Sequence, residues 1–250
     1  MATTPKKTLA FFGATDGCAG TCLALALNAG YQLVRTPSNP TNHRTRDQRR
    51  SDGRHNVNGV GATPKLQWSL VKPVIIDQPT LCQDVTATFS EVSRELSSSS
   101  HKPVFINVSM TGIPSEGKPW DVPTKFTWMY RYVLQQTHED KRRVQEMIEE
   151  DMRSQQSGIG VHVLVKPSLL MDGRALSSGK VRVDTEDQPE IGDTIRREDV
   201  GRFMFERLVK EDVKAKWRNT SLTITYWLQK VCKSDARQEA RSSCDISSAL

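Results

Sequence analysis

The sequence has no long apolar run. Within its 250 residues, no stretch reaches the roughly 18 consecutive apolar residues that a membrane-spanning helix needs. Lys6 and Lys7 precede apolar residues, as in a signal peptide, but Gly13, Asp16 and Gly17 interrupt the run and no small-residue cleavage site follows. These absences predict a cytoplasmic protein that does not use the membrane as a partner.

Cysteine is scarce and the charge is moderate. The five cysteines are Cys18, Cys22, Cys82, Cys232 and Cys244, and they form neither a C-x-x-C pair nor the spacing of a metal site. We therefore expect a reducing compartment and no metal. The net charge of +6 suits a protein that binds phosphates, but the basic residues are too dispersed to indicate nucleic acid as the main partner.

The most informative stretch that is present runs from Thr8 to Tyr31. Thr8–Phe12 is a short apolar run that predicts a buried parallel strand, residues 13–20 form a glycine-rich turn, and a helix is expected to follow until Gly30. This order is typical of the phosphate-binding opening of a Rossmann unit, where a pyrophosphate meets a helix N-terminus. The spacing differs from a strict G-x-G-x-x-G, so a turn without a ligand is the alternative. Cys18 is either a redox-sensitive thiol at the helix N-terminus or, as we favour, a small residue filling the turn.

The next segment is short and basic. Tyr31–Arg35 predicts a very short second strand, and Arg35 stands where Rossmann units contact the adenosine ribose. An arginine there accommodates the extra phosphate of NADP, whereas an acid favours NAD; a solvated arginine is the alternative. Residues 36–56 are polar, contain clustered arginines and lack any strand or helix period, which predicts a basic irregular loop.

Three later strands carry polar or glycine residues at their ends. Val57–Ala62 indicates the end of a strand that opens into a turn at Gly61, and Val104–Val108 indicates a buried strand followed by Ser109. A third strand, Val161–Lys166, ends in a lysine. Ligands of open α/β sheets bind at the carboxyl ends of strands, so these residues are candidates for the site.

Helices are expected between and after these strands. The predicted helices are Pro79–Leu96, Gln135–Met152 and Val200–Val209, the last capped by Asp199, and the last predicted strand is Leu222–Leu228. The second helix places His138 and Lys141 one turn apart on the same side. The aromatic segment Trp120–Tyr132 either walls an apolar cleft or belongs to the core.

Strands that alternate with helices predict one α/β domain with a mostly parallel sheet and helices on both faces. We expect this Rossmann-like domain over residues 1–233, with a small substrate-side region formed by Thr111–Tyr132 and Leu169–Ile195. Residues 234–250 are predicted to be a disordered tail.

Seven sequence blocks together carry a resemblance. In chain order they are GATDGCAG, LVRTPS, NGVGA, VFINVSMTG, HEDKRRVQEMI, HVLVKPSLLMDG and IRREDVGRFMFERL. They resemble the atypical short-chain dehydrogenase/reductase family, and within it the NmrA-like NAD(P)H-binding branch that includes biliverdin reductase B and fungal oxidoreductases of polyketide pathways. The similarity runs from Lys7 to about Val209.

The resemblance implies a Rossmann fold with bound NADP, whose second and third strands are shortened or missing here. The cofactor-binding residues that we predict are Gly13, Thr15, Asp16, Gly17, Cys18, Arg35, Gly61 and Lys166, and the predicted catalytic residues are Ser109, His138 and Lys141. Asp16 stands where the family generally has glycine. Its charge about 5 Å from a phosphate charge would cost on the order of 3 kcal/mol at an effective dielectric constant of about 20. The family's Tyr-x-x-x-Lys dyad is absent, and its helix carries His138 and Lys141 instead.

The leading functional hypothesis is an NADP-dependent oxidoreductase that transfers a hydride to a small apolar or aromatic carbonyl or quinone-type substrate, with secondary metabolism as one setting. In this hypothesis Ser109 binds the substrate oxygen, and His138 or Lys141 helps to deliver a proton. The alternatives are a regulator that binds the dinucleotide without turnover and a degenerate paralogue that binds no cofactor.

Overall fold

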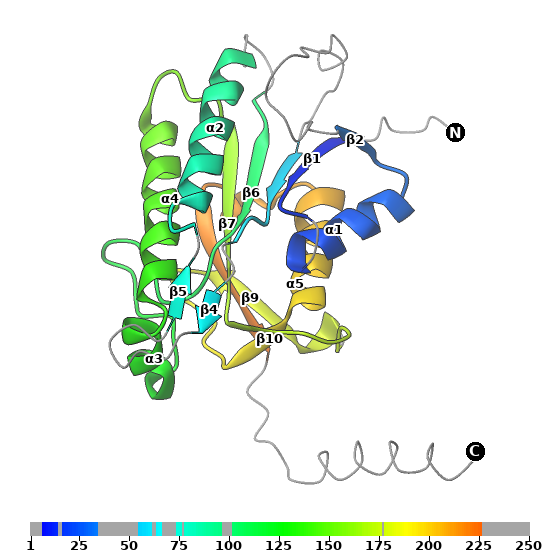
Figure 1. The fold of residues 1–250 in the computed structure, drawn as a ribbon. Coiled ribbons are helices and arrows are strands. Elements are labelled where there is room, and N and C mark those ends of the chain that lie inside the picture. Colours follow the sequence, from blue (N-terminus) through cyan, green and yellow to red (C-terminus); the bar gives the residue numbers. More distant parts are fainter. Residues whose placement is uncertain are drawn as a thin grey trace, which may run out of the picture.

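The computed structural model describes residues 7–14, 17–34, 55–61, 64–66, 74–76, 78–96, 102–176 and 178–226 (Figure 1). The predictions for Thr15, Asp16 and Arg35, for most of the basic segment 36–56 and for the tail 234–250 lie outside these residues. Within them, no helix is both long and apolar enough to cross a bilayer.

A seven-stranded sheet forms the middle layer. Its strands are β1 (Thr8–Phe12), β2 (Gln32–Val34), β3 (His55–Asn58), β6 (Val104–Val108), β7 (Val161–Pro167), β9 (Val181–Thr185) and β11 (Thr220–Tyr226). They lie in the order β2-β1-β3-β6-β7-β11-β9, and every neighbouring pair is parallel except β11 with β9. This confirms the prediction of a mostly parallel Rossmann-like sheet.

Two small sheets stand apart from the main one. Strand β4 (Pro64–Leu66) pairs with β5 (Val74–Ile76) in an antiparallel manner, and β8 (Leu169–Met171) pairs in parallel with β10 (Thr194–Arg196). The predicted substrate-side region Leu169–Ile195 was therefore only partly right, because β9 lies within it and yet extends the main sheet. Its side chains pack on the same core as the parallel strands, which favours edge pairing over a separate unit.

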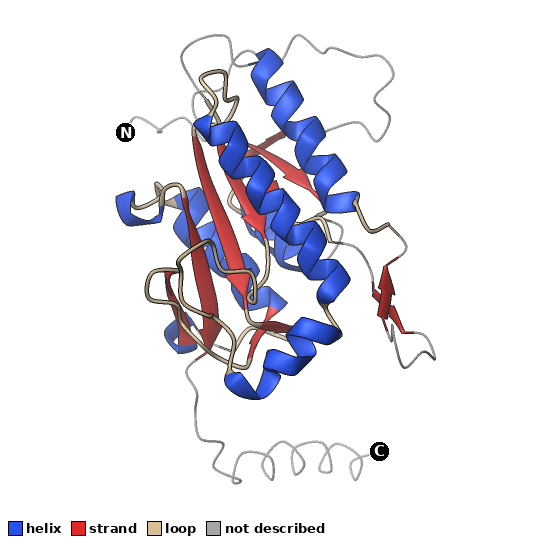
Figure 2. Cartoon of the chain, turned by 90° about the vertical axis from the view of Figure 1, so that its left-hand side faces the viewer, coloured by secondary structure: helices blue, strands red, loops and turns tan. Residues whose placement is uncertain are grey.

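Helices cover both faces of the sheet, as predicted. They are α1 (Gly17–Asn28), α2 (Leu81–Leu96), α3 (Thr127–Tyr132), α4 (Gln135–Arg153) and α5 (Arg197–Phe203), which continues as the π-helix η4 (Met204–Lys210). Short 3-10 helices are η2 (Thr124–Phe126), η3 (Ser178–Lys180) and η5 (Ala215–Trp217). Helices α2 and α4 pack side by side over one face, facing the viewer in Figure 2, and α1 and α5 pack together over the other.

Successive side chains of β6 point to opposite faces of the sheet, so this strand contributes to the hydrophobic core on both faces. Phe105 belongs to the cluster under α2 and α4, where its ring stacks on Phe89 with centroids 4.3 Å apart. The next residue, Ile106, belongs to the cluster under α1 and α5. Both side chains are fully buried, as expected for a central strand covered on two faces.

The β3 strand corrects one boundary. The predicted irregular loop over 36–56 extends two residues too far, because His55 and Asn56 already belong to β3 and are buried. These two polar residues form a strand because β3 lies between β1 and β6, and both neighbouring strands supply backbone hydrogen-bond partners. The buried side chain of Asn58 has a hydrogen-bond partner on the neighbouring strand β6, because its Nδ2 atom donates to Oδ1 of Asn107 at 2.9 Å.

The predicted cap at Asp199 was wrong. Arg196 occupies the N-cap position, and its side chain makes no cap hydrogen bond. Asp199 lies inside the first turn of α5, where its carboxylate accepts from the backbone N–H of Leu176, at 2.9 Å, and from the hydroxyl of Tyr226. Because both partners come from distant segments, tertiary packing decides this role.

The short second strand was predicted correctly. Strand β2 has three residues and forms the edge of the sheet in the part of the chain that the structure describes. No strand among the described residues pairs on its outer side, and the predicted reduction of residues 36–56 lies mostly outside these residues.

Candidate functional site

The site is organised by the point where the sheet changes its winding direction. Strand β1 has β2 on one side and β3 on the other, and in such sheets the crevice at the carboxyl ends beside that point receives ligands. Gly13 ends β1 with a φ of +62°, and a Cβ atom there would lie 2.7 Å from the Cα of Val60. A Cβ on Gly59 would overlap Ala19 of α1. The two turns can pack this closely because both positions are glycine.

The N-terminus of α1 opens beside this crevice. Gly17 begins the helix with a φ of +70°, and the side chain of Arg197 passes 3.5 Å from the place of its missing Cβ. Arg197 also forms an ion pair with the exposed Asp172, at 2.5 Å. Cys18 is buried, and burial raises the pKa of its thiol to about 12 although Arg197 acts in the opposite direction. Cys18 therefore remains a protonated thiol, which fits the packing role favoured from the sequence.

Lys141 of α4 joins two strand ends. Its Nζ atom donates to the backbone oxygen of Val60, at 2.8 Å, and to that of Val108, at 3.0 Å. Val60 and Val108 immediately precede Gly61 and Ser109. Lys141 therefore holds both predicted site residues close together, beyond the carboxyl ends of β3 and β6. An ammonium group has three donors, and two of them are used by these carbonyls.

Ser109 presents a buried hydroxyl at the carboxyl end of β6. Its backbone N–H donates to the oxygen of Val165 at 2.8 Å, which fixes the chain at the end of β6. Its Oγ atom is buried and has no hydrogen-bond partner among the described residues. Gly61 has no atom within 4 Å of the place of its missing Cβ, so the space beside it is open.

His138 lies one turn before Lys141, as predicted, and is buried. Burial, together with the charge of Arg142, lowers the pKa of His138 to about 4. Its hydrogen bond to the Thr111 backbone raises the pKa, but this effect is smaller. Its Nε2 atom has no partner among the described residues. The loop after Ser109 passes close by, because a Cβ on Gly112 would lie 3.0 Å from the His138 ring.

A cavity of about 360 Å³ opens against His138. Its lining residues are Gly112, Trp120, Tyr130, Arg131, Gln135, His138, Glu139 and Arg142. The Tyr130 ring lies 5.4 Å from that of His138, and the Arg131 guanidinium lies 5.8 Å from the Trp120 ring. The aromatic segment Trp120–Tyr132 is thus divided, since two of its rings line the cavity while Trp128 and Tyr132 are mostly exposed.

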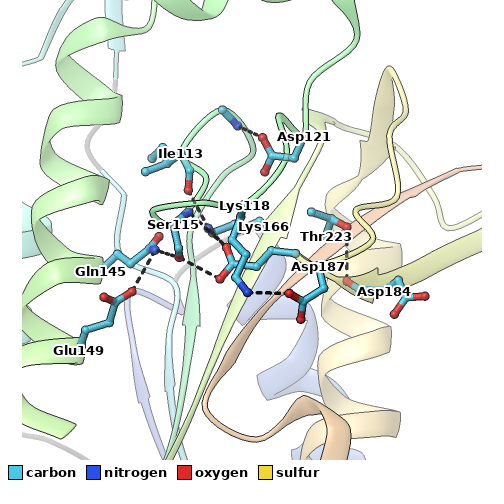
Figure 3. Close-up of polar contacts among 12 residues, drawn as sticks. Ile113, Ser115, Lys118, Asp121, Gln145, Glu149, Lys166, Asp184, Asp187 and Thr223 are labelled. Atoms are coloured by element: carbon cyan, nitrogen blue, oxygen red, sulfur yellow. Dashed lines mark hydrogen bonds and ion pairs between the residues drawn. The ribbon is translucent and has the colours of Figure 1, made fainter. Parts of the chain in front are cut away.

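Lys166, a predicted cofactor ligand, lies in a buried polar network (Figure 3). Its side chain is fully buried, and Nζ donates to the backbone oxygen of Ile113 at 2.7 Å and to Glu186 at 3.0 Å. The hydroxyl of Ser115 donates to the same carboxylate at 2.8 Å and accepts from Gln145 of α4 at 2.6 Å. The network fastens the loop that follows Ser109 to β7, α4 and the end of β9.

The structure thus brings Gly13, Gly61, Ser109, His138 and Lys141 to one edge of the sheet, with Gly17 and Cys18 beside them. The sequence reasoning included Tyr130 only as one ring of the aromatic segment, and it missed Asp121, Glu186, Arg197 and the Asn58–Asn107 pair. Asp121 accepts from the backbone N–H of Gly112 at 2.7 Å, and burial raises the pKa of its carboxyl. Only the aromatic run around Tyr130 gave a signal, because the other contacts join segments far apart in the chain.

The described residues contain no group of three or more His, Cys, Asp or Glu side chains that could hold a metal ion.

Comparison with known proteins agrees with this geometry. No protein-family model matches the chain. The chain is 36% identical over 263 residues to Reductase pytE of Aspergillus terreus, an alignment that covers 88% of this chain and 98% of that protein. The chain belongs to the atypical short-chain dehydrogenase/reductase family. Another relative, Oxidase pynE of Aspergillus niger, is 29% identical and is covered over 99% of its length.

Solved structures of similar shape share the fold of this chain. The anaerobilin reductase ChuY of Escherichia coli O157:H7 superposes with a TM-score of 0.56 at 14% identity, over 90% of this chain and 99% of that one. A short-chain dehydrogenase/reductase of Veillonella parvula, solved in complex with NADP, gives 0.53 at 14% identity, over 87% and 94%.

Proposed function

We propose that this family member is an NADP-dependent oxidoreductase that reduces a carbonyl or quinone-type group of a small aromatic substrate. The observation that carries the proposal is the convergence of Ser109, His138 and Lys141 beside two tight glycine turns. All five features lie where a Rossmann sheet receives its dinucleotide, and the aromatic cavity lies next to them. The relatives named a reductase and an oxidase support redox chemistry.

The residues present fit a dinucleotide. The packed turns at Gly13 and Gly59 bring the backbone against the crevice, and α1 begins beside them at Gly17, where the positive end of the helix dipole suits a pyrophosphate. Arg197 adds a positive charge beside this helix start, which favours an anionic ligand there. The open space beside Gly61 suits the nicotinamide half. When bound, NADPH supplies the hydride.

Each polar group of the site receives a role. Ser109 Oγ donates to the substrate oxygen that gains negative charge, because this hydroxyl is buried and its partner is missing. Lys141 donates to two carbonyls among the described residues, and we assign its third donor to the same charge and make it the proton source. His138 is neutral at pH 7 because of its lowered pKa, so we assign it acceptance of a hydrogen bond from a substrate hydroxyl instead of proton delivery. Lys166 positions the loop that follows Ser109.

These assignments name a substrate class. The Nε2 atom of His138 accepts a hydrogen bond, while Arg131 and Arg142 of the same cavity attract acceptor oxygens. Trp120 and Tyr130 provide flat apolar walls. An aromatic ring that carries both a hydroxyl and a carbonyl, such as a hydroxyquinone, matches all three features.

The preference for NADP rests on Arg35, which lies outside the described residues. Replacing Arg35 by alanine should weaken NADPH binding by about 1–3 kcal/mol, because a charge-assisted hydrogen bond to the extra phosphate is lost. NADH binding should hardly change. Titrations followed by nicotinamide fluorescence measure both affinities, and an equal loss for the two cofactors would contradict the preference.

A turnover experiment tests the reaction itself. NADPH oxidation is followed with a hydroxynaphthoquinone, a flavin and a ketone as acceptors. Ser109→Ala should lower kcat about 100-fold, as the loss of one donor to a developing oxyanion does elsewhere. Thr88→Ala, which removes an exposed hydroxyl on α2, is the matched control and should keep full activity. NADPH binding without oxidation of any acceptor would favour the regulator, and no binding would favour the degenerate paralogue.

A further inference from the structure

A second cavity, of about 290 Å³, lies on the face of the sheet that α5 covers, away from the cavity beside His138. It is lined by Val181 and Val183 of β9, by Asp199, Arg202, Phe203, Glu206 and Arg207 of α5 and η4, and by Lys214 and Trp217 near η5. It shares no lining residue with the cavity beside His138. Helix α5 covers the face that carries α1 (Figure 1). The cavity beside His138 is instead lined by residues of α3 and α4.

Three lining side chains carry buried polar atoms without a hydrogen-bond partner among the described residues. They are Oδ1 of Asp199, Nε of Arg202 and Nε1 of Trp217. Asp199 is 2% exposed and Trp217 is 5% exposed, so bulk water does not satisfy them. Buried polar groups normally have partners, and leaving them unpaired costs free energy. The two nitrogens are donors, and the carboxylate oxygen is an acceptor. A ligand that pairs with all three atoms therefore needs an acceptor group for the nitrogens and a hydroxyl for the oxygen.

The apolar part of the lining is aromatic. Phe203 and Trp217 meet edge to face, with ring centroids 5.7 Å apart, and Val181 and Val183 of β9 add aliphatic side chains to the lining. The ammonium group of Lys214 lies 4.7 Å from the Trp217 ring. Two rings inclined at 63° offer both a face and an edge to a third ring, and such contacts favour an aromatic ligand.

The charges of the lining favour a monoanion. Arg202, Arg207 and Lys214 contribute three positive charges, and Asp199 and Glu206 contribute two negative ones, which leaves one positive charge uncompensated. The two arginines also pair with Glu198 and Glu211, but these pairs are partly exposed and therefore weak. Either guanidinium can turn from its surface partner to a carboxylate in the cavity at little cost.

The backbone at this cavity is unusual. Glu206 and Arg207 come from η4, a π-helix of seven residues that continues α5 directly. Such segments are rare and frequently occur at functional sites. The wider turn shifts the register of the side chains that follow Phe203.

We propose that this cavity is a second small-molecule site, which binds a hydroxylated aromatic monocarboxylate. The carboxylate accepts from Arg202 Nε and Trp217 Nε1, the ring packs between Phe203 and Val183, and the hydroxyl donates to Asp199 Oδ1. The site is separate from hydride transfer.

The full chain labelled with 5-fluorotryptophan tests this proposal. The five tryptophans give five fluorine resonances, and Trp217→Phe assigns one of them. Titration with 4-hydroxybenzoate should shift the Trp217 resonance in a saturable manner with one molecule bound per chain. Phenol, which lacks the carboxylate, should bind at least tenfold more weakly.

A pair of variants provides the control. Arg202→Gln should weaken 4-hydroxybenzoate at least tenfold and leave NADPH binding unchanged. Lys210→Gln removes a positive charge from η4 outside the cavity and should leave both affinities unchanged. The proposal is overturned if the Trp217 resonance does not respond to 4-hydroxybenzoate, which would leave only water in the cavity. Equal effects of the two variants would also overturn it.

Discussion

Replacing Lys166 by methionine should destabilise the protein far more than replacing Lys118 by methionine. Both lysines form ion pairs with residues just beyond β9: Lys166 reaches Glu186 from β7, and Lys118 reaches Asp187 from the loop after β6. Lys166 contacts Glu186 at 3.0 Å, with side chains 0% and 10% exposed, and Lys118 contacts Asp187 at 2.6 Å, with side chains 36% and 63% exposed (Figure 3). Burial is the main difference between them.

The expected magnitudes follow from that burial. Without Lys166 the carboxylate of Glu186 stays buried and keeps only its hydrogen bonds to Ser115. Removing one partner of a buried ion pair costs about 3–5 kcal/mol, because the remaining charge is desolvated without compensation. An exposed pair contributes about 0–1 kcal/mol, so Lys118→Met should fall in that range.

Urea unfolding followed by circular dichroism measures both effects. The double variant Lys166→Met/Glu186→Gln should recover part of the loss, because it removes the unpaired charge. If Lys166→Met lost no more stability than Lys118→Met, the buried network would not hold the loop, and the positioning role given to Lys166 would be wrong.

Two further predictions concern helix packing and pH. Gly201→Ala should destabilise the protein by about 1–3 kcal/mol in urea unfolding, because the new Cβ would lie 2.6 Å from the Cβ of Thr21 and would overlap the backbone of Cys18; Gly61→Ala, with open space around it, should not. The folded-state pKa of His138, about 4, lies below the ordinary 6.5. The unfolded chain therefore binds the extra proton first, and the contribution of His138 to stability is complete above about pH 6.5 and is lost as the pH falls towards 4. His138→Gln should remove on the order of 2–3 kcal/mol of the stability change between pH 7 and 4, and an unchanged pH profile would refute the assignment.

The local pattern of the sequence was sufficient for most of the sheet and helices. Thr8–Phe12 and Val104–Val108 were predicted with the bounds that β1 and β6 have. Helix α4 ends one residue beyond its predicted end. Such elements are encoded within a few consecutive residues, by apolar runs, helical periodicity and the glycines or serines that end them. The convergence of Gly61 and Ser109 was predictable because parallel strands end at the same edge, whereas the place of His138 and Lys141 at the site came from the family resemblance.

Tertiary structure decided what depends on partners from distant segments. The sequence alone determined that the chain forms an α/β fold with a glycine-rich turn after β1. It did not show that Asp199 would bind Tyr226 instead of capping its helix, or that Lys166 would be neutralised by Glu186. The reason is that a buried charge takes whichever partner the packed chain places within hydrogen-bond reach. That choice depends on strand order and on the antiparallel addition of β9, which no local period encodes.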